Sequence, residues 1–196
     1  MLIALSAVCF AAMPVFARVV YRAGVDPQTL LALRFSCAAA VLLPLSIARR
    51  AALPPRGVLI GLVLMGGVGY VSQSLSYFTA LTMTSAALLG LLLYLYPVLV
   101  AVLARFFFRV PLSRARILAL GLAVCGAALA IGPLGDSSGG SSLGVSLGLL
   151  SALIYSFYNL AAARVAKDVD PLSSATIIIS AAAVVSVGTT EASAAR

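Results

Sequence analysis

Long apolar runs separated by short polar segments dominate the pattern along the chain. About 20 consecutive apolar residues cross the roughly 30 Å of hydrocarbon in a bilayer. A first run covers 1–17, and a second covers 28–48 and is interrupted by Arg34. Later runs lie at 117–131, at 143–163 and, richer in β-branched residues, at 172–187. Each run predicts a transmembrane helix.

The longest run extends from 57 to 104 and carries no charge over 48 residues. As one helix it would be about 70 Å long at 1.5 Å per residue, more than twice the thickness of the hydrocarbon. It must therefore be two spans. The polar cluster "TALTMTSA" at 79–86 predicts the hairpin between a third span at 57–79 and a fourth at 84–104. The fold class expected is all-α: a polytopic bundle of about seven transmembrane helices.

Composition agrees with a membrane protein. Hydrophobic residues make up 63% of the 196 residues, charged residues 9%, and the mean hydropathy is +1.16. A soluble core of this size could not bury so much apolar surface. The net charge of +8 does not indicate nucleic-acid binding, because no aromatic or glycine motif accompanies the short basic clusters. The expected surroundings are a lipid bilayer, with no nucleic-acid partner.

The basic residues predict the orientation. Nine Lys and Arg residues fall in the loops after the second, fourth and sixth spans, at 49–56, 105–116 and 164–167. The opposite side holds Arg18, Arg22 and Arg196. Cytoplasmic loops are enriched in Lys and Arg, so the N-terminus and the basic loops are predicted to be cytoplasmic in a multi-pass protein of the cytoplasmic (inner) membrane.

Residues that enzymes need are scarce. The sequence contains no His, and its five acidic residues lie in loops or near the ends of the predicted spans. Three single cysteines, at 9, 37 and 125, lack the paired spacing of a metal or redox site. A hydrolase inside the membrane would need a nucleophile with its base, paired carboxylates or a metal site. We therefore expect no catalytic residues, no metal and no cofactor.

Short sequences recur at a nearly constant offset. "LSA" at 5–7 returns at 150–152, "ARV" at 17–19 at 163–165, and "VDP" at 25–27 at 169–171, offsets of 144 to 146. The repeated unit would hold five spans. Because five is odd, the second copy enters the membrane from the opposite side, the inverted repeat of many secondary transporters. The predicted division is a first repeat at 1–135 and a truncated start of the second at 136–196.

Three longer stretches resemble the EamA-type family of the drug/metabolite transporter superfamily: "DPQTLLALRFSCAAAVLLPL", "YFTALTMTSAALLGLLLYLYPVLVAVLARFFF" and "LSRARILALGLAVCGAALAI". The resemblance implies ten helices in two inverted five-helix halves, and it stops before the last three. It also implies that Arg34 and Pro97 match the family's second-helix arginine and fourth-helix proline. The family's "GE" after the fourth helix aligns here with Arg109 and Val110, a departure from the pattern.

Pro97 lies inside the fourth predicted span. It leaves the carbonyl of Leu93 without its helical donor, which a bilayer tolerates only beside protein, a polar group or water. This span is therefore expected to face the interior. Two interpretations are open: a kink that makes room for substrate and flexes between access states, or a static kink that serves packing.

Polar side chains form stripes at helical spacing in the third and sixth spans. Such stripes favour either a site for a small amphipathic solute or interhelical hydrogen bonds. Arg34, the one charge inside a span, either orients an acidic group of the substrate or extends toward the headgroups. The candidate substrate pathway comprises Arg34, Tyr70, Gln73, Tyr77, Tyr94, Pro97, Ser151, Tyr155 and Asn159.

The function expected is transport of small organic metabolites or amphipathic compounds, by efflux or exchange with alternating access. The alternative is a truncated, inactive or assembly-dependent membrane protein without transport of its own. Partners expected are a small-molecule substrate and the lipid bilayer. A homodimer, or missing helices supplied by another chain, would fit the truncated second repeat.

Overall fold

The computed structural model describes residues 2–109, 114–131 and 141–194, and the described part forms helices without strands. The boundary predicted at 135/136, most of the glycine-rich loop before the sixth span and Val110 lie outside the described residues. The helices are α1 (Leu2–Arg22), α2 (Pro27–Ala48), α3 (Arg56–Leu64), η1 (Met65–Tyr70), α4 (Val71–Met83), α5 (Ala86–Leu93), α6 (Tyr96–Phe108), α7 (Arg114–Ile131), α8 (Ser142–Val165) and α9 (Pro171–Ala194).

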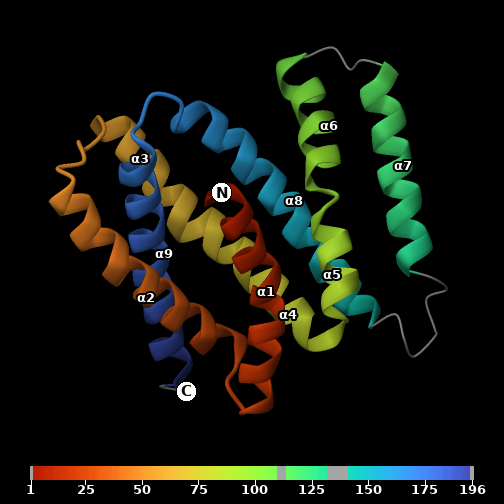
Figure 1. The fold of residues 1–196 in the computed structure, drawn as a ribbon, viewed down its shortest axis with the longest axis horizontal. Coiled ribbons are helices and arrows are strands. Elements are labelled where there is room, and N and C mark those ends of the chain that lie inside the picture. The colour runs from red at the N-terminus through yellow and green to blue at the C-terminus, as the bar shows by residue number, and fades with distance from the viewer. Residues whose placement is uncertain (1, 110–113, 132–140, 195–196) are drawn as a thin grey trace.

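These helices form a membrane helix bundle, as predicted. Within the described residues, five continuous stretches are long and apolar enough to cross a membrane: 27–48, 56–83, 86–108, 142–165 and 171–192. The other two predicted spans correspond to α1 and α7. In Figure 1, α1 lies in front of α4 and beside α2, α2 packs along α9 and α4 along α8, whereas the α6–α7 pair extends to one side of the bundle.

The α4–α5 hairpin is tighter than the sequence suggested. Residues 79–83, expected in the turn, continue α4, and the turn itself consists of Thr84 and Ser85. The Ser85 hydroxyl accepts a hydrogen bond from the backbone N–H of Leu88 at 3.1 Å and caps α5. Arg18 of α1 donates to the backbone carbonyl of Thr84, which ties the first helix to this hairpin.

The third span contains a segment that its apolar pattern did not reveal. Between α3 and α4 the chain forms the π-helix η1, whose sequence "MGGVGY" has three glycines. A Cβ placed on Gly66 would lie 2.2 Å from the backbone oxygen of Ile178 in α9. Glycine is therefore required there, because α9 packs directly against the backbone of the π-helical turn.

The fourth span is broken rather than gently kinked. The helix α5 ends at Leu93, α6 begins at Tyr96, and Pro97 occupies the first turn of α6, where a missing N–H costs little. Leu92 and Leu93 are buried, whereas α6 has no buried residue among those described. The expectation that this span faces the interior therefore holds for α5 but not for α6.

The seventh span is longer than predicted. Its apolar run ends near Val187, but α9 continues to Ala194. In the added turns, the hydroxyls of Thr189 and Thr190 both donate to the carbonyl of Ser186 at 2.9 Å. Internal hydrogen bonds of this kind let a polar sequence continue the helix.

Candidate functional site

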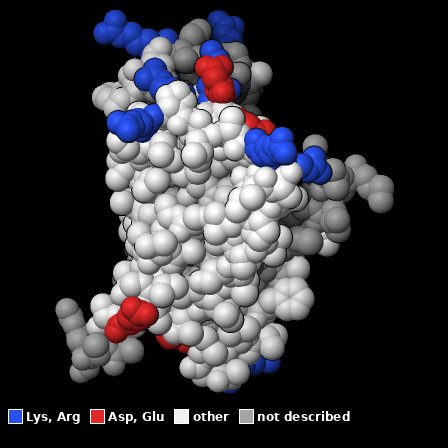
Figure 2. Space-filling view, turned by 90° about the vertical axis from the view of Figure 1, so that its left-hand side faces the viewer, with Lys and Arg blue, Asp and Glu red and all other residues white. Residues whose placement is uncertain are grey.

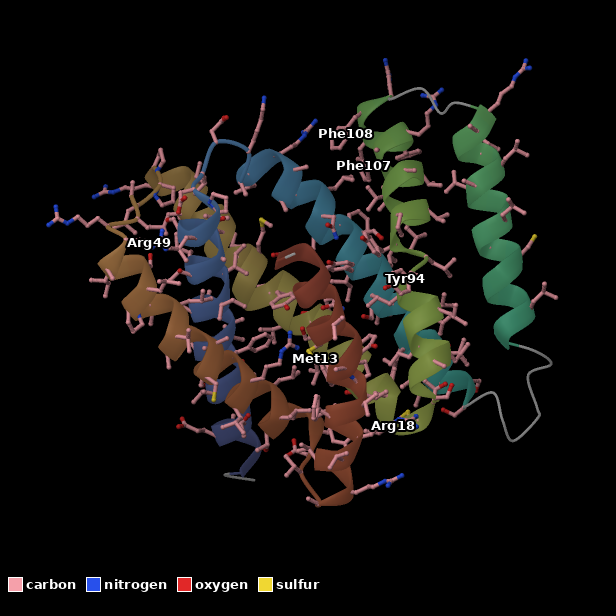
Figure 3. The ribbon with its side chains drawn as sticks, viewed as in Figure 1. Met13, Arg18, Arg49, Tyr94, Phe107 and Phe108 are labelled. Carbon is pink, nitrogen blue, oxygen red and sulfur yellow. The ribbon has the colours of Figure 1, made fainter. Side chains whose placement is uncertain are left out.

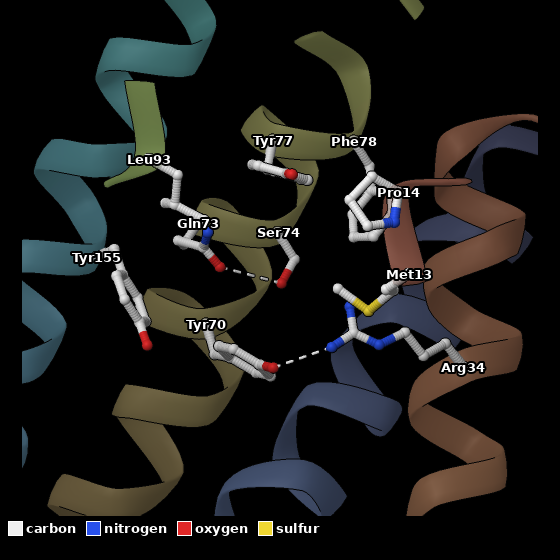
Figure 4. A pocket seen from close by; sticks show the side chains of 10 residues that line it. All are labelled: Met13, Pro14, Arg34, Tyr70, Gln73, Ser74, Tyr77, Phe78, Leu93 and Tyr155. Atoms are coloured by element: carbon white, nitrogen blue, oxygen red, sulfur yellow. Dashed lines mark hydrogen bonds between the residues drawn. The ribbon is translucent and has the colours of Figure 1, made fainter. Parts of the chain in front are cut away.

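A small polar pocket lies inside the bundle, between α1, α2, α4, α8 and the end of α5 (Figure 4). Its volume is about 50 Å³. A cavity of this size holds a functional group or a few water molecules rather than a whole metabolite. Its lining residues are Met13, Pro14, Arg34, Tyr70, Gln73, Ser74, Tyr77, Phe78, Leu93 and Tyr155.

Arg34 supplies the positive charge of this pocket. Its Nη2 donates to the Tyr70 hydroxyl at 3.1 Å, so the side chain points into the bundle (Figure 4). Its guanidinium carbon lies 5.3 Å from the ring centroid of Phe35 and 5.6 Å from that of Phe78. These contacts favour the interior placement over extension to the headgroups.

The π-helical turn positions the partner of Arg34. Tyr70 is the last residue of η1, directly before α4 begins. Its ring lies 5.4 Å from Phe35 and 5.8 Å from Tyr158, measured between centroids. Single π-helical turns occur often at functional sites, where the extra residue per turn redirects a side chain.

Gln73 forms a buried connection between α4 and α8. Its side-chain nitrogen donates to the Ser151 hydroxyl at 3.0 Å, and its side-chain oxygen accepts from Ser74 at 3.3 Å. The Ser151 hydroxyl in turn donates to the backbone carbonyl of Gln73 at 3.2 Å. Both ends of the amide are thus engaged, so Gln73 has fewer free hydrogen-bonding groups for a ligand than the sequence suggested.

Aromatic rings form the side of the pocket opposite Arg34. Tyr155 stacks on Tyr158, with centroids 6.1 Å apart and planes 8° from parallel. Tyr96 meets Tyr155 edge-on at 4.8 Å. These contacts hold the Tyr155 ring at the pocket wall, where an apolar or aromatic solute could pack against it.

The structure brings five of the nine predicted pathway residues into the pocket: Arg34, Tyr70, Gln73, Tyr77 and Tyr155. Ser151 lies directly behind Gln73. Asn159 donates to the backbone carbonyl of Tyr155 at 2.7 Å and does not line the pocket.

The remaining two predicted residues lie away from the pocket. Tyr94 is 71% exposed and projects from the α5–α6 break (Figure 3), and Pro97 is exposed in the first turn of α6. Leu93, one residue before the break, lines the pocket in their place.

The predicted set left out five lining residues: Met13, Pro14, Ser74, Phe78 and Leu93. Phe78 could have been found, because it lies one helical turn after Ser74 on the side of the polar stripe. Pro14 was a signal of the same kind as Pro97, a proline inside an apolar helix. Met13 and Leu93 carry no distinguishing signal, because apolar residues line any face of such helices.

A second, larger hollow of about 660 Å³ lies between α2 and the loop after it, α3, η1 and α9. Most of its lining residues are aliphatic or small, and Arg50 is the one charged residue among them. The Ser180 hydroxyl at its wall is buried and has no hydrogen-bond partner among the described residues. This hollow lacks the convergent charge and polar groups of the first pocket.

The first pocket can bind, through one cation, several neutral hydrogen-bonding groups and aromatic faces. Its described lining residues include no carboxylate, cysteine or histidine. Inserting a charged guanidinium near the centre of a bilayer costs about 2.5–3.5 kcal/mol of free energy or more. Two cation–π contacts and one neutral hydrogen bond offset part of that cost.

Comparison with known proteins gives a family match and a structural match. The sequence model of the EamA-like transporter family matches residues 1–132. The chain is also similar to a solved structure described as the crystal structure of a protein, with a TM-score of 0.59 and 24% identity. That match covers 92% of this chain and 64% of the other, so the chain spans less than two thirds of the solved protein. At this identity the likeness shows the fold. No curated protein matches the chain significantly.

Proposed function

Because the chain belongs to the EamA-like transporter family, we propose that it moves small organic metabolites or amphipathic compounds across the membrane by alternating access. The observation that carries this proposal is the pocket itself: a charged and hydrogen-bonding site enclosed by apolar membrane helices. Polar groups in such a position are costly, and they are typical of substrate pathways. Efflux and exchange both fit this arrangement.

The repeated sequence supports a pathway between two inverted halves. Asp26 and Asp170, the central residues of the two "VDP" tripeptides, both accept backbone hydrogen bonds at a helix start followed by proline. The start of α9 lies beside the end of α2, since Ser173 donates to the Ala52 carbonyl at 2.9 Å. The two equivalent helices are therefore antiparallel, which favours repeats at 1–135 and 136–196, with the pocket between α8 of the second and helices of the first.

The break between α5 and α6 offers a joint for the movement. It separates the buried α5, which contributes Leu93 to the pocket, from α6, whose described side chains are not buried. A change of backbone angles at Tyr94 and Leu95 would move α6 with little repacking of α5. Discontinuous helices beside the binding site are typical of alternating-access transporters.

Charge placement supports the orientation. Figure 2 shows Lys and Arg gathered at one end of the molecule. Arg49 and Arg18 lie toward opposite ends in Figure 3. By the positive-inside rule, the α2–α3 and α8–α9 loops and the N-terminus are expected to face the cytoplasm, with the chain in the cytoplasmic (inner) membrane.

An assembly-dependent membrane protein is the second candidate. The chain spans 64% of the solved structure that it resembles. In this candidate, a second copy or another chain supplies the helices that complete the second repeat. Transport would then depend on assembly rather than on the single chain.

The first test is counterflow in proteoliposomes. Vesicles are loaded with an unlabelled small aromatic solute, and uptake of the labelled solute is measured, which needs no knowledge of a coupling ion. Tyr155→Ala removes a ring from the pocket wall, and Phe157→Ala is the matched control, because Phe157 on the same helix is 45% exposed. Loss of about 1.4 kcal/mol of ring contact lowers uptake about tenfold in Tyr155→Ala.

Equal uptake by both variants, at equal abundance in the membrane, would contradict the pathway through this pocket. Uptake that appears only when two differently tagged copies, or an added partner chain, are reconstituted together would favour the assembly-dependent candidate. No uptake of any solute under either condition would contradict transport.

A further inference from the structure

The charge of Arg34 has no counter-charge among the described side chains. A guanidinium has five N–H donors and stays protonated in proteins. One donor is engaged by the Tyr70 hydroxyl, and the remaining described contacts are the faces of Phe35 and Phe78. A neutral hydroxyl and two rings leave the positive charge uncompensated.

The depth of Arg34 makes this imbalance significant. It lies about 10 Å along α2 from Pro27, at 1.5 Å per residue, and its side chain points into the pocket rather than along the helix toward the membrane surface (Figure 4). Surrounding apolar helices strengthen the interaction of this charge with any group that enters. The missing partner is therefore a negative charge that comes with the ligand.

On this basis we propose that the pocket selects small organic monoanions, with a carboxylate bound to Arg34 and Tyr70. The inference rests on the proposed transport function and names its substrate class. The Arg34 guanidinium donates to the carboxylate oxygens, and the Tyr70 hydroxyl, which now accepts from Arg34, can donate its own proton to the same group.

The size and charge of the pocket favour a carboxylate over a phosphate. A volume of about 50 Å³ accommodates a planar carboxylate. One cation balances one negative charge, whereas a phosphate ester carries up to two and is commonly bound by several donors and cations. Arg34 is the one cation among the described lining residues.

The opposite wall indicates the rest of the ligand. Leu93, Tyr77 and Tyr155 lie across the pocket from Arg34 in Figure 4. They offer apolar area and ring faces, with no second charge. The anion is therefore expected to carry an apolar or aromatic body. Because about 50 Å³ accommodates the carboxylate alone, that body requires the pocket to widen as the ligand binds. A neutral or cationic analogue of the same shape would leave Arg34 uncompensated.

The test uses three probes of nearly identical shape and different charge: benzoate, benzamide and benzamidine. Binding to the purified full chain in lipid nanodiscs is followed by tyrosine fluorescence, because the protein has no tryptophan and three pocket residues are tyrosines. We expect benzoate to bind at least tenfold more tightly than the other two. Arg34→Gln abolishes that preference, and Arg34→Lys, which keeps the charge but not the fork of donors, retains part of it.

Benzoate that binds no more tightly than benzamide, or no detectable binding of any probe, overturns the inference. This comparison is made on the unaltered protein and does not depend on whether Arg34→Gln folds. Arg34-dependent binding of benzoate without counterflow contradicts the transport function but leaves anion recognition intact. Counterflow of benzamide or benzamidine without a preference for benzoate contradicts anion recognition but leaves the transport function intact.

Discussion

Asp26 and Asp170 show how single residues set the limits of the membrane helices. The Asp26 carboxylate accepts from the backbone N–H groups of Gln28 and Thr29, and that of Asp170 accepts from Ser173. Each satisfies donors that the first helical turn cannot pair internally. The following proline already has a helical φ and has no N–H that would need an acceptor, so "VDP" begins a helix at both places where it occurs in this chain.

The cap at Asp26 predicts a pH-dependent stability. A hydrogen bond from the Thr29 side chain, helped by backbone donors, holds the pKa of Asp26 below its usual value. Asp26→Ala should lower the stability by about 1 kcal/mol at neutral pH. A lowered pKa stabilises the folded state above the ordinary value near about 4, and this contribution disappears as the pH falls through the lowered pKa.

Thermal unfolding of Asp26→Ala and the unaltered protein in detergent measures this difference at several pH values. The two midpoints should converge below about pH 4. Arg22→Ala, one exposed residue at the end of α1, is a control for loss of an unrelated charge near the same turn. A difference between midpoints that stays constant with pH would contradict capping by the ionised carboxylate.

At the scale of elements, two irregular segments place the pocket. The π-helix η1 brings Tyr70 against Arg34, and the α5–α6 break leaves Leu93 at the pocket wall. Neither is a regular transmembrane helix, although each lies inside a run long enough to be one. Irregular backbone in a membrane is tolerated where it is buried in protein or lines a cavity. The segment η1 meets that condition because α9 packs against it, whereas at the break Leu93 lines the pocket but Tyr94 is 71% exposed.

The contact between η1 and α9 predicts that replacing Gly66 by a larger residue lowers the stability of the protein. Gly66→Ala would place a methyl group 2.2 Å from the Ile178 carbonyl oxygen, and backbone atoms must move to admit it. We expect a loss of about 1–3 kcal/mol in unfolding free energy. Gly57→Ala, in α3 of the same span, is the matched control, because its Cβ would meet nothing within 4 Å.

Unfolding in mixed micelles with increasing denaturing detergent compares the two variants. Gly57→Ala should be unchanged or slightly more stable, since alanine is the better helix former. Equal stability of the two variants would show that α9 does not pack against the η1 backbone as described.

At the scale of the whole molecule, the unequal charge of the two ends predicts the orientation in the membrane. The prediction is tested by Ala52→Cys in the α2–α3 loop and Ala23→Cys in the α1–α2 turn, each in a chain whose native cysteines are replaced by alanine. A membrane-impermeant maleimide should label Ala23→Cys on intact cells and Ala52→Cys only after permeabilisation. The opposite pattern would reverse the proposed topology. Both positions are exposed, so access to the reagent is matched.

The helix bundle could be predicted because its physical basis lies along the chain. Runs of about 20 apolar residues must cross the bilayer, and the predicted limits agree with most helix ends. The α4–α5 turn and the end of α9 differ because side-chain hydroxyls cap or continue helices in polar sequence. The hydropathy pattern does not record these local hydrogen bonds, so it could not predict the two helix ends.

The site could be predicted in part. Tyr70 at the end of η1 and Gln73 and Tyr77 in α4 line the pocket together, so helical spacing was sufficient within the third span. Whether Tyr155 or Asn159 lines the pocket depends on the orientation of α8 about its own axis relative to α4. That orientation is fixed by the Gln73–Ser151 bond and by ring packing, which helical spacing within one span does not specify.

The sequence by itself determined that this protein is a multi-span membrane helix bundle. It also determined where the helices begin and which end of the bundle is the more basic. These properties follow from hydropathy, caps and charge, which are local. The tertiary structure alone decided that Arg34 turns inward to Tyr70, that Pro97 and Tyr94 stay outside the pocket, and that η1 is π-helical. Those outcomes depend on contacts between helices distant in sequence, whose packing geometry no single run of residues encodes.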